Sequence, residues 1–366
     1  MVKSWPLYAK ITALVLLIYL LLYGFYIGQA ILNPLGFAFL FSILLRPLEK
    51  KFLNWHFPKI LAILLTLIIA IIFLAGLITF LSKQIASFVK DVPAVQHNLN
   101  DLWDKIQQWI THTFSLSEEQ QQKIIDKAKS ATVNNLEPMG TLNIITASLA
   151  TMVLIPVYIF LFLYYRTLLL RFITELFEER HFRNVQEVLH EIRYVMQHYI
   201  TGLMTETSIV AVLNVAGLLL IGAPFAILLG IIAAILNLIP YIGGVIAIFL
   251  TALLTFTNTD SITKMIWSVV VFLVVQLIDN NFLVPRIIAS RVQLNALITI
   301  VGVLIGGALC GIGGMFLSIP LIAICKVIFD RVEGLQPWGR LLGDDIPKPR
   351  LKHVLRKARK AQPTTK

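Results

Sequence analysis

The sequence predicts an all-α fold, a polytopic transmembrane helical bundle with two broken-helix or hairpin segments. Of its 366 residues, 57% are hydrophobic and 14% are charged, whereas soluble proteins average about 45–50% and about 25%. Several apolar runs exceed about 18 residues without a charge, which is long enough to span a hydrocarbon core about 30 Å thick. Asparagine, proline and glycine interrupt two still longer apolar segments in their middle. So many apolar runs exclude both a soluble fold and a lone signal peptide.

Residues 1–81 are expected to hold the N-terminal membrane helices. Lysines precede the first span, Ile11–Ile27, which is longer than the apolar core of a signal peptide. A second, shorter apolar stretch covers residues 33–45, and Ile60–Leu81 is a third span. Basic residues fill the connection between these two, which predicts a cytoplasmic loop. With the N-terminus also cytoplasmic, the first two stretches are expected to form a hairpin.

The rest of the chain divides by polarity and helical periodicity. The part after the third span is polar, with apolar residues at three- or four-residue steps, which predicts amphipathic helices outside the membrane. A later amphipathic stretch is rich in arginine and is expected on the cytoplasmic side. In chain order the expected segments are an extramembrane helical insert (82–141), a transmembrane helix (142–165), a cytoplasmic amphipathic segment (166–200), a core with two interrupted helical segments (201–330) and a basic cytoplasmic tail (331–366).

Charge and cysteine content exclude several function classes. The formal net charge of +11 would suggest a nucleic-acid partner in a soluble protein. Here the basic residues gather beside the apolar spans and in the tail, where the positive-inside rule explains them, so no nucleic acid is expected. Cys310 and Cys325 both lie in apolar segments. They support neither a disulfide framework nor a thiolate metal site, and no cofactor is expected.

Two apolar segments, Ala223–Phe256 and Ala296–Phe329, are too long for one untilted crossing. If each crossed once, the loop with Arg286 and Arg291 would face outward, against the positive-inside rule. If each is a helical hairpin or a re-entrant pair, that loop and the C-terminal tail both stay cytoplasmic. The charge distribution therefore favours two hairpins.

The interruptions in these segments are the first candidate site. Helix-breaking backbone at membrane depth is tolerated only where protein buries it or where it lines a water-filled cavity. Two broken segments in corresponding positions point to the binding site of a transporter, although glycines also serve close helix packing. The candidate residues of the first break are Asn237, Pro240, Tyr241, Gly243 and Gly244. Those of the second break are Gly306, Gly307, Gly311, Gly313 and Gly314.

A polar cluster between the two breaks is the second candidate. A carboxylate in a spanning helix costs at least about 2.5 kcal/mol near the membrane centre, so Asp279 is expected to face a cavity or a partner. It could bind a cation, take up a proton, pair with Arg286, or lie near the cytoplasmic interface. Gln276 and Asn280 fall one turn apart and share a face. Near the start of the fifth span, Glu206 is a second carboxylate. The candidate pathway residues of this group are Gln276, Asp279, Asn280, Asn281 and Glu206.

These motifs resemble the AI-2E family of transporters, the autoinducer-2 exporter family of bacterial membrane proteins. The resemblance lies in Leu236–Gly243, in Gln276–Asn281 with Pro285, and in Gly306–Pro320, in the family's order and spacing. The layout, with a polar insert after the third span, is also similar. One departure is Thr201-Gly202-Leu203, where many relatives carry an Arg-Gly-Gln element. The resemblance implies an inner-membrane, homo-oligomeric transporter without a catalytic reaction.

The resemblance does not fix the substrate, because the family includes proteins linked to autoinducer-2 export and others linked to Na⁺(Li⁺)/H⁺ antiport. The leading expectation is a secondary permease or exporter of a small polar solute, with residues 201–330 as the transport core. An antiporter would use the same scaffold, with Asp279 as the titrating group. A membrane scaffold that acts through its basic tail is a further alternative. An enzyme is not expected, since no phosphate-binding loop, zinc motif or nucleophile elbow is present. Both termini are expected in the cytoplasm of a bacterial cell.

Overall fold

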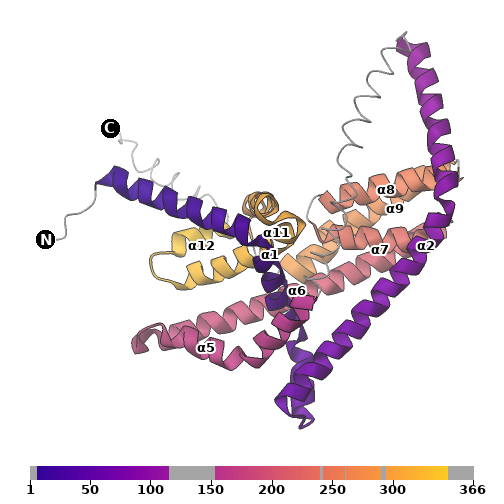
Figure 1. The fold of residues 1–366 in the computed structure, drawn as a ribbon. Helices are drawn as coiled ribbons and strands as arrows, with labels where there is room; N and C mark the ends of the chain where they lie inside the picture. Colours follow the sequence, from indigo (N-terminus) through magenta and orange to yellow (C-terminus); the bar gives the residue numbers. More distant parts are fainter. Residues whose placement is uncertain (1–5, 115–152, 240–241, 260, 290–293, 345–366) are drawn as a thin grey trace, which may run out of the picture.

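The described part of the chain is helical and contains no β-strand. Five of its helices are long and apolar enough to cross a membrane, or six if a bent pair counts as one span. These helices confirm the predicted all-α, polytopic membrane fold (Figure 1). The computed structural model describes five stretches of the chain, which are residues 6–114, 153–239, 242–259, 261–289 and 294–344.

The first helix, α1 (Leu7–Asn54), corrects one prediction. It is a single helix of 48 residues that contains Pro34 and Pro47, so the chain does not turn back at residue 34 and the expected N-terminal hairpin is wrong. A proline removes one backbone donor and bends a helix, but neighbouring helices can hold the helix together on both sides. A helix that crosses a membrane once has its ends on opposite faces. The predicted hairpin therefore no longer supports the expectation that the N-terminus is cytoplasmic.

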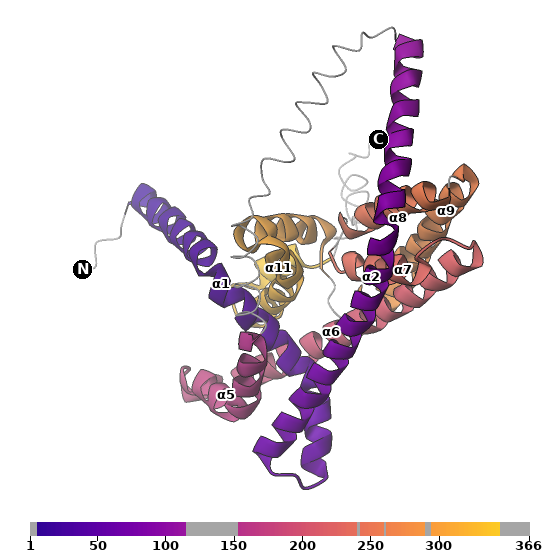
Figure 2. The same cartoon turned by 45° about the vertical axis from the view of Figure 1, so that its right-hand side comes forward.

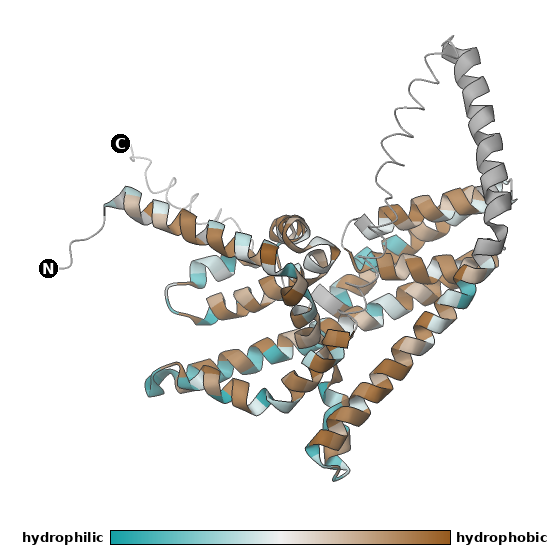
Figure 3. Cartoon of the chain, in the orientation of Figure 1, coloured by the Kyte–Doolittle hydropathy of each residue, from teal (hydrophilic) through white to brown (hydrophobic). Residues whose placement is uncertain are grey.

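The second helix, α2 (Lys59–Phe114), runs without a break from the third span into the polar insert. The predicted boundary at residue 82 is thus a change of polarity within one helix of 56 residues. Its far end extends well beyond the other described helices (Figures 1 and 2). Residues 115–141, the second half of the insert, lie outside the described residues. The apolar surface of α1 and of the first half of α2 is exposed on several sides, as expected for contact with lipid (Figure 3).

The fourth span is described from Val153 onward. The helix Val153–Tyr164 meets α5 (Arg166–Glu175) at a bend of 63°. After the short η1 (Glu179–His181), α6 (Phe182–Leu220) continues as one helix of 39 residues. It joins the predicted amphipathic segment to the fifth span, so the boundary expected at residue 201 is also internal to a helix.

The first over-long segment is a helical hairpin of α7 (Ala226–Asn237) and α8 (Ile242–Thr259). Its two arms pack against each other through one apolar cluster that includes Ala233 and Ala247. At 1.5 Å per residue, α7 is only about 18 Å long, which is too short to span about 30 Å of hydrocarbon. The hairpin therefore has the length of a re-entrant segment, which enters the membrane and returns to the same side.

The second over-long segment, α11 (Ala296–Arg331), also reverses direction. The reversal is at Cys310 and Gly311, whose backbone is not helical, and Gly311 has φ of 61°, which favours glycine. The arms then run antiparallel. Gly302 lies against Ile322, and Gly306 lies against Ser318 and the Gly314 carbonyl.

The ends of the second hairpin meet again. The Asn295 N–H, just before α11, donates to the Leu342 carbonyl at 2.9 Å, at the end of α12 (Gln336–Leu342). The start of α11 and the beginning of the C-terminal tail therefore lie side by side. Both hairpins agree with the prediction made from the charge distribution.

The two hairpins enter from opposite ends of α6. Near the start of α6, Glu187 and Glu191 each lie 3.8 Å from Arg331, at the end of α11. Beyond the other end of α6, the Gly222 carbonyl lies 3.5 Å from Lys264 Nζ, at the open end of the α7–α8 hairpin. Since α6 is about 58 Å long, these two entrances are far apart.

Candidate functional site

Two carboxylates from different helices meet at the tip of the first hairpin. Asn237, the last residue of α7, donates from Nδ2 to Glu206 Oε1 at 3.1 Å and to Asp279 Oδ2 at 2.9 Å. Both carboxylate oxygens are bonded to one nitrogen atom, so they lie no more than about 6 Å apart, close enough for strong mutual repulsion when both are ionised. The structure thus brings together three of the sequence-predicted site residues, one from each of three segments.

Local structure explains why these side chains converge. α9 (Ile262–Ile278) ends at Ile278, and at Asp279 the chain widens into η2 (Asp279–Ala289), a π-helix. Such widened turns are frequent at functional sites, because they displace side chains from the regular helical positions. α6 packs closely on η2, since a Cβ atom at Gly202 would lie 3.0 Å from the Ile287 carbonyl oxygen. That contact is one turn of α6 away from Glu206.

The pair is almost completely buried. Glu206 is 3% exposed and Asp279 is 2% exposed. Within the described part of the chain, Asp279 Oδ1 has no hydrogen-bond partner, and a buried acceptor in that state costs about 1–3 kcal/mol, or more if it is charged. Val210, Ala234 and Val275 form one buried apolar cluster. Each lies about one helical turn from a residue of the site. A buried pair of this kind favours a bound proton or cation.

The remaining residues of the first break support the tip of the hairpin. At Gly243, a Cβ atom would lie 1.7 Å from the Leu236 carbonyl oxygen, so only glycine fits there. At Gly244, a Cβ atom would lie 3.1 Å from Gln276 Oε1, which places the Gln276 amide against the tip. Pro240 and Tyr241 lie outside the described residues.

The other polar residues of the cluster make local contacts. Gln276 Nε2 donates to Asn280 Oδ1 at 3.3 Å, which confirms that these two side chains share a face. Asn281 is exposed and donates back to the Leu277 carbonyl of its own helix. The Arg286 guanidinium lies 5.8 Å from the centre of the Phe282 ring.

The tip of the second hairpin has a different partner. Asn33 of α1 donates to the Cys310 carbonyl at 3.1 Å, and its side chain packs against Gly313. In the described residues, Asn237 bonds the carboxylates and Asn33 bonds the second tip, and no hydrogen bond joins the two tips. Gly307 lies against Met315 within the hairpin. The glycines of this break therefore shape the reversal and the helix packing, as the packing alternative anticipated.

Comparison with known proteins gives this arrangement a family. A family model described as "AI-2E family transporter" matches residues 14–334. The chain belongs to the AI-2E transporter family.

Three relatives span most of this AI-2E chain. The "Putative transport protein YhhT" of Escherichia coli (strain K12) is 26% identical over 90% of this chain and 93% of its own. The "Putative transport protein YueF" of Bacillus subtilis (strain 168) is 27% identical over 80% of each chain. The "AI-2 transport protein TqsA" of E. coli (strain K12) is 24% identical over 92% of this chain and 96% of its own. These relatives and the apolar helices support the conclusion that the protein is a multi-pass membrane protein of the transporter class.

The AI-2E bundle also contains buried polar residues that the sequence did not single out as site residues. Asn214 on α6 is 2% exposed and Thr255 on α8 is 0% exposed, and the Asn214 Oδ1 and Thr255 Oγ1 atoms have no hydrogen-bond partner among the residues that the structure describes. Thr251 and Ser268, on α8 and α9, are equally buried. Along α6, Asn214 is about 12 Å beyond Glu206. The sequence signal for Asn214 is its spacing, because it follows Glu206 by eight residues and so lies on nearly the same face of the helix, two turns further along.

Helical geometry shows where Asn214 points. Its neighbour Val215 contacts Gly230 of α7, and Gly217 contacts Val271 of α9. At 100° per residue, the direction of Asn214 lies between these two contacts, toward the interior of the bundle. Thr251 is eight residues beyond Gly243 in α8 and Ser268 is eleven residues before Asp279 in α9, about 12 Å and about 17 Å along their helices. By helix length, the buried polar residues of α6–α9 therefore fall on two levels, one with the carboxylates and one with an amide and hydroxyl groups.

Proposed function

We propose that this AI-2E protein is a secondary transporter of a small polar solute in the bacterial inner membrane, with Glu206 and Asp279 as its coupling site. The observation that carries the proposal is the buried carboxylate pair on one amide, with an unpartnered oxygen on Asp279. In a water-poor interior, a proton or monovalent cation between the two carboxylates offsets their repulsion. Binding and release of that charge drive the transport cycle.

The hairpins supply the moving parts of the proposal. Transporters commonly expose a central site to each side in turn by moving one group of helices against another. Asn237 joins the site to the tip of the first hairpin, so binding or loss of that charge changes the contact between the hairpin and α6. The two hairpins enter from opposite ends of α6, which suits a gate on each side. The buried amide and hydroxyl level near Asn214 lies on the solute path.

The substrate is proposed from a relative. The name of the AI-2 transport protein TqsA assigns AI-2 to that protein, and AI-2 is accordingly the first solute to test. The alternative is Na⁺(Li⁺)/H⁺ antiport, which the carboxylate pair favours because it would bind both coupling ions. A non-transporting scaffold would need neither carboxylate.

Purified protein in proteoliposomes with an entrapped pH dye tests these alternatives. Gradients of AI-2, Na⁺ and Li⁺ are imposed in separate arms. A proton-coupled solute transporter changes the internal pH when the AI-2 gradient is imposed, and an antiporter does so when a Na⁺ or Li⁺ gradient is imposed. Asp279→Asn protein, inserted in equal amount, should give no signal. A protein that gives no pH signal in any arm does not couple transport to protons.

A further inference from the structure

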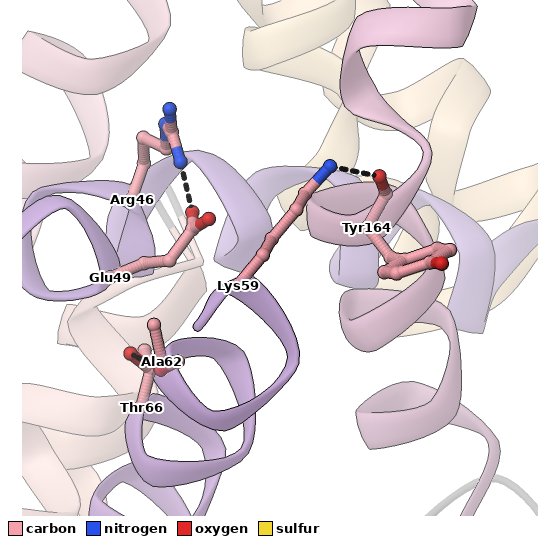
Figure 4. A network of polar contacts seen from close by, with 6 residues as sticks. All are labelled: Arg46, Glu49, Lys59, Ala62, Thr66 and Tyr164. Atoms are coloured by element: carbon pink, nitrogen blue, oxygen red, sulfur yellow. Dashed lines mark hydrogen bonds and ion pairs between the residues drawn. The ribbon is translucent and has the colours of Figure 1, made fainter. Parts of the chain in front are cut away.

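A second charged cluster lies where α1, α2, α5 and α6 meet, away from the carboxylate pair. Arg46 and Glu49 of α1 form an ion pair, and Glu49 has no exposed side-chain surface. Lys59, at the start of α2, donates to the Tyr164 carbonyl at 2.7 Å and lies 5.1 Å from the centre of its ring. Figure 4 shows these residues side by side at the junction of three helices.

Two further arginines complete the cluster. Arg166 begins α5 just beyond the bend, and the charges of Arg46, Arg193 and Glu49 all act on it. Burial, followed by the positive charges of Arg46 and Arg193, lowers the pKa of Arg166. A guanidinium group nevertheless stays charged at any pH a protein experiences. The arginines are therefore held together against their mutual repulsion.

The charges of this cluster do not balance. Among the described residues, Arg46, Arg193 and Glu49 are the charges that act on Arg166, so three arginines with one carboxylate leave a net charge of +2. Lys59 adds a further cation at the same helix junction (Figure 4). On α6, the acidic residues near Arg193 are engaged elsewhere, because Glu187 and Glu191 lie beside Arg331. The Arg46 Nε atom is buried and has no acceptor among the described residues. An anion with several acceptor oxygens that bonds the other guanidinium nitrogens would neutralise the excess charge.

The surroundings place this cluster at the edge of the membrane. Trp55 is 58% exposed, Tyr165 is 47% exposed and Leu168 is 63% exposed. Exposed tryptophan and tyrosine beside apolar residues are typical of the headgroup level of a bilayer. Basic pockets between membrane helices on the cytoplasmic side bind anionic headgroups. An acyl chain beside the cluster would meet apolar side chains, while its phosphate would meet arginine.

We propose that Arg46, Arg166, Arg193 and Lys59 form a binding site for the phosphate of an anionic phospholipid of the cytoplasmic leaflet. Bidentate arginine contacts suit the planar sets of phosphate oxygens, and Lys59 adds a point charge. The lipid would join α1, α2 and α5 to α6 at the base of the bundle. The site is independent of the transport proposal, since none of its residues contacts the carboxylate pair.

Thermal unfolding in an uncharged detergent tests the lipid site. Phosphatidylglycerol, phosphatidylcholine and inorganic phosphate are added in separate arms to the full-length protein. Phosphatidylglycerol should raise the unfolding midpoint of the wild type more than phosphatidylcholine does, because a ligand of the folded state stabilises it. Arg166→Gln should lose at least half of that difference. Arg171→Gln, on the same helix with a 79% exposed side chain, is the matched control and should keep it.

Three outcomes would overturn the proposal. Equal shifts with both lipids would mean that the headgroup charge is not recognised. An equal loss in Arg171→Gln would mean a general surface-charge effect. The same shift with inorganic phosphate alone would assign the cluster to a free anion. If Arg166→Gln does not fold, Arg193→Gln decides by the same criterion, because Arg193 contributes charge from a different helix.

Discussion

Glu206 and Asp279 accept hydrogen bonds from the same nitrogen atom, Asn237 Nδ2, at 3.1 and 2.9 Å. The bond partners belong to α6, to η2 and to the tip of the α7–α8 hairpin, so one side chain links the charge of the site to a re-entrant segment. Both carboxylates are buried. A change of charge at either carboxylate must therefore alter the strength of the hydrogen bonds that attach the hairpin tip to α6 and η2.

Replacement of Asn237 by alanine should destabilise the protein. Hydrogen bonds to charged groups contribute about 1.5–3 kcal/mol, and Asn237→Ala removes two of them, so the free energy of unfolding should fall by at least about 2 kcal/mol. Denaturation in detergent measures this change. Asn281→Ala is the control, because its exposed amide bonds only its own helix. An equal loss of stability in the control would show that the two hydrogen bonds of Asn237 contribute little.

The tip of the first hairpin should not tolerate a side chain at residue 243. A Cβ atom there would lie 1.7 Å from the Leu236 carbonyl oxygen, and relief of such a clash by backbone movement typically costs about 1–3 kcal/mol. Gly243→Ala should lower the unfolding midpoint and reduce flux. Gly24→Ala, with nothing within 4 Å of the new atom, should behave as wild type. A stable Gly243→Ala protein would contradict the described tip.

Features that depend on local periodicity can be predicted from the sequence. Features that depend on tertiary packing cannot. Gln276 and Asn280 share a face because the helical repeat requires it. Glu206 and Asp279 were both candidates, but their pairing depends on how closely α6 approaches η2 at Gly202, which no local pattern encodes. At residue 34, proline indicated a turn, yet α1 continues through it.

The opposite entry of the two hairpins predicts opposite accessibility. Ile262, at the start of α9 and near the open end of the α7–α8 hairpin, is 60% exposed, and Trp338 on α12 is 59% exposed. In a variant without Cys310 and Cys325, Ile262→Cys should react with an impermeant maleimide in intact cells. Trp338→Cys should react only after permeabilisation, because the basic tail that follows it is expected in the cytoplasm. Equal labelling of both positions from outside would contradict this topology.

The tip of the second hairpin should depend on Asn33. Its amide donates to the Cys310 carbonyl at the reversal, and a bond of this kind contributes about 1 kcal/mol. Asn33→Ala should speed amide hydrogen exchange near Gly311 and leave exchange in α8 unchanged. Thr79→Val is a suitable control, because the Thr79 hydroxyl is exposed and bonds only its own helix. Unchanged exchange around the reversal would mean that α1 does not restrain it.

Coupled flux in proteoliposomes tests the carboxylate pair most directly. Glu206→Gln, Asp279→Asn and the double variant keep size and hydrogen-bonding capacity but remove charge. If the two carboxylates act as one site, each single variant should lose pH-dependent flux as fully as the double variant does, because residues that act as a unit are not additive. Glu175→Gln, an exposed carboxylate paired with Arg171, should retain flux. Wild-type flux with unchanged pH dependence in correctly inserted Asp279→Asn protein would contradict the account.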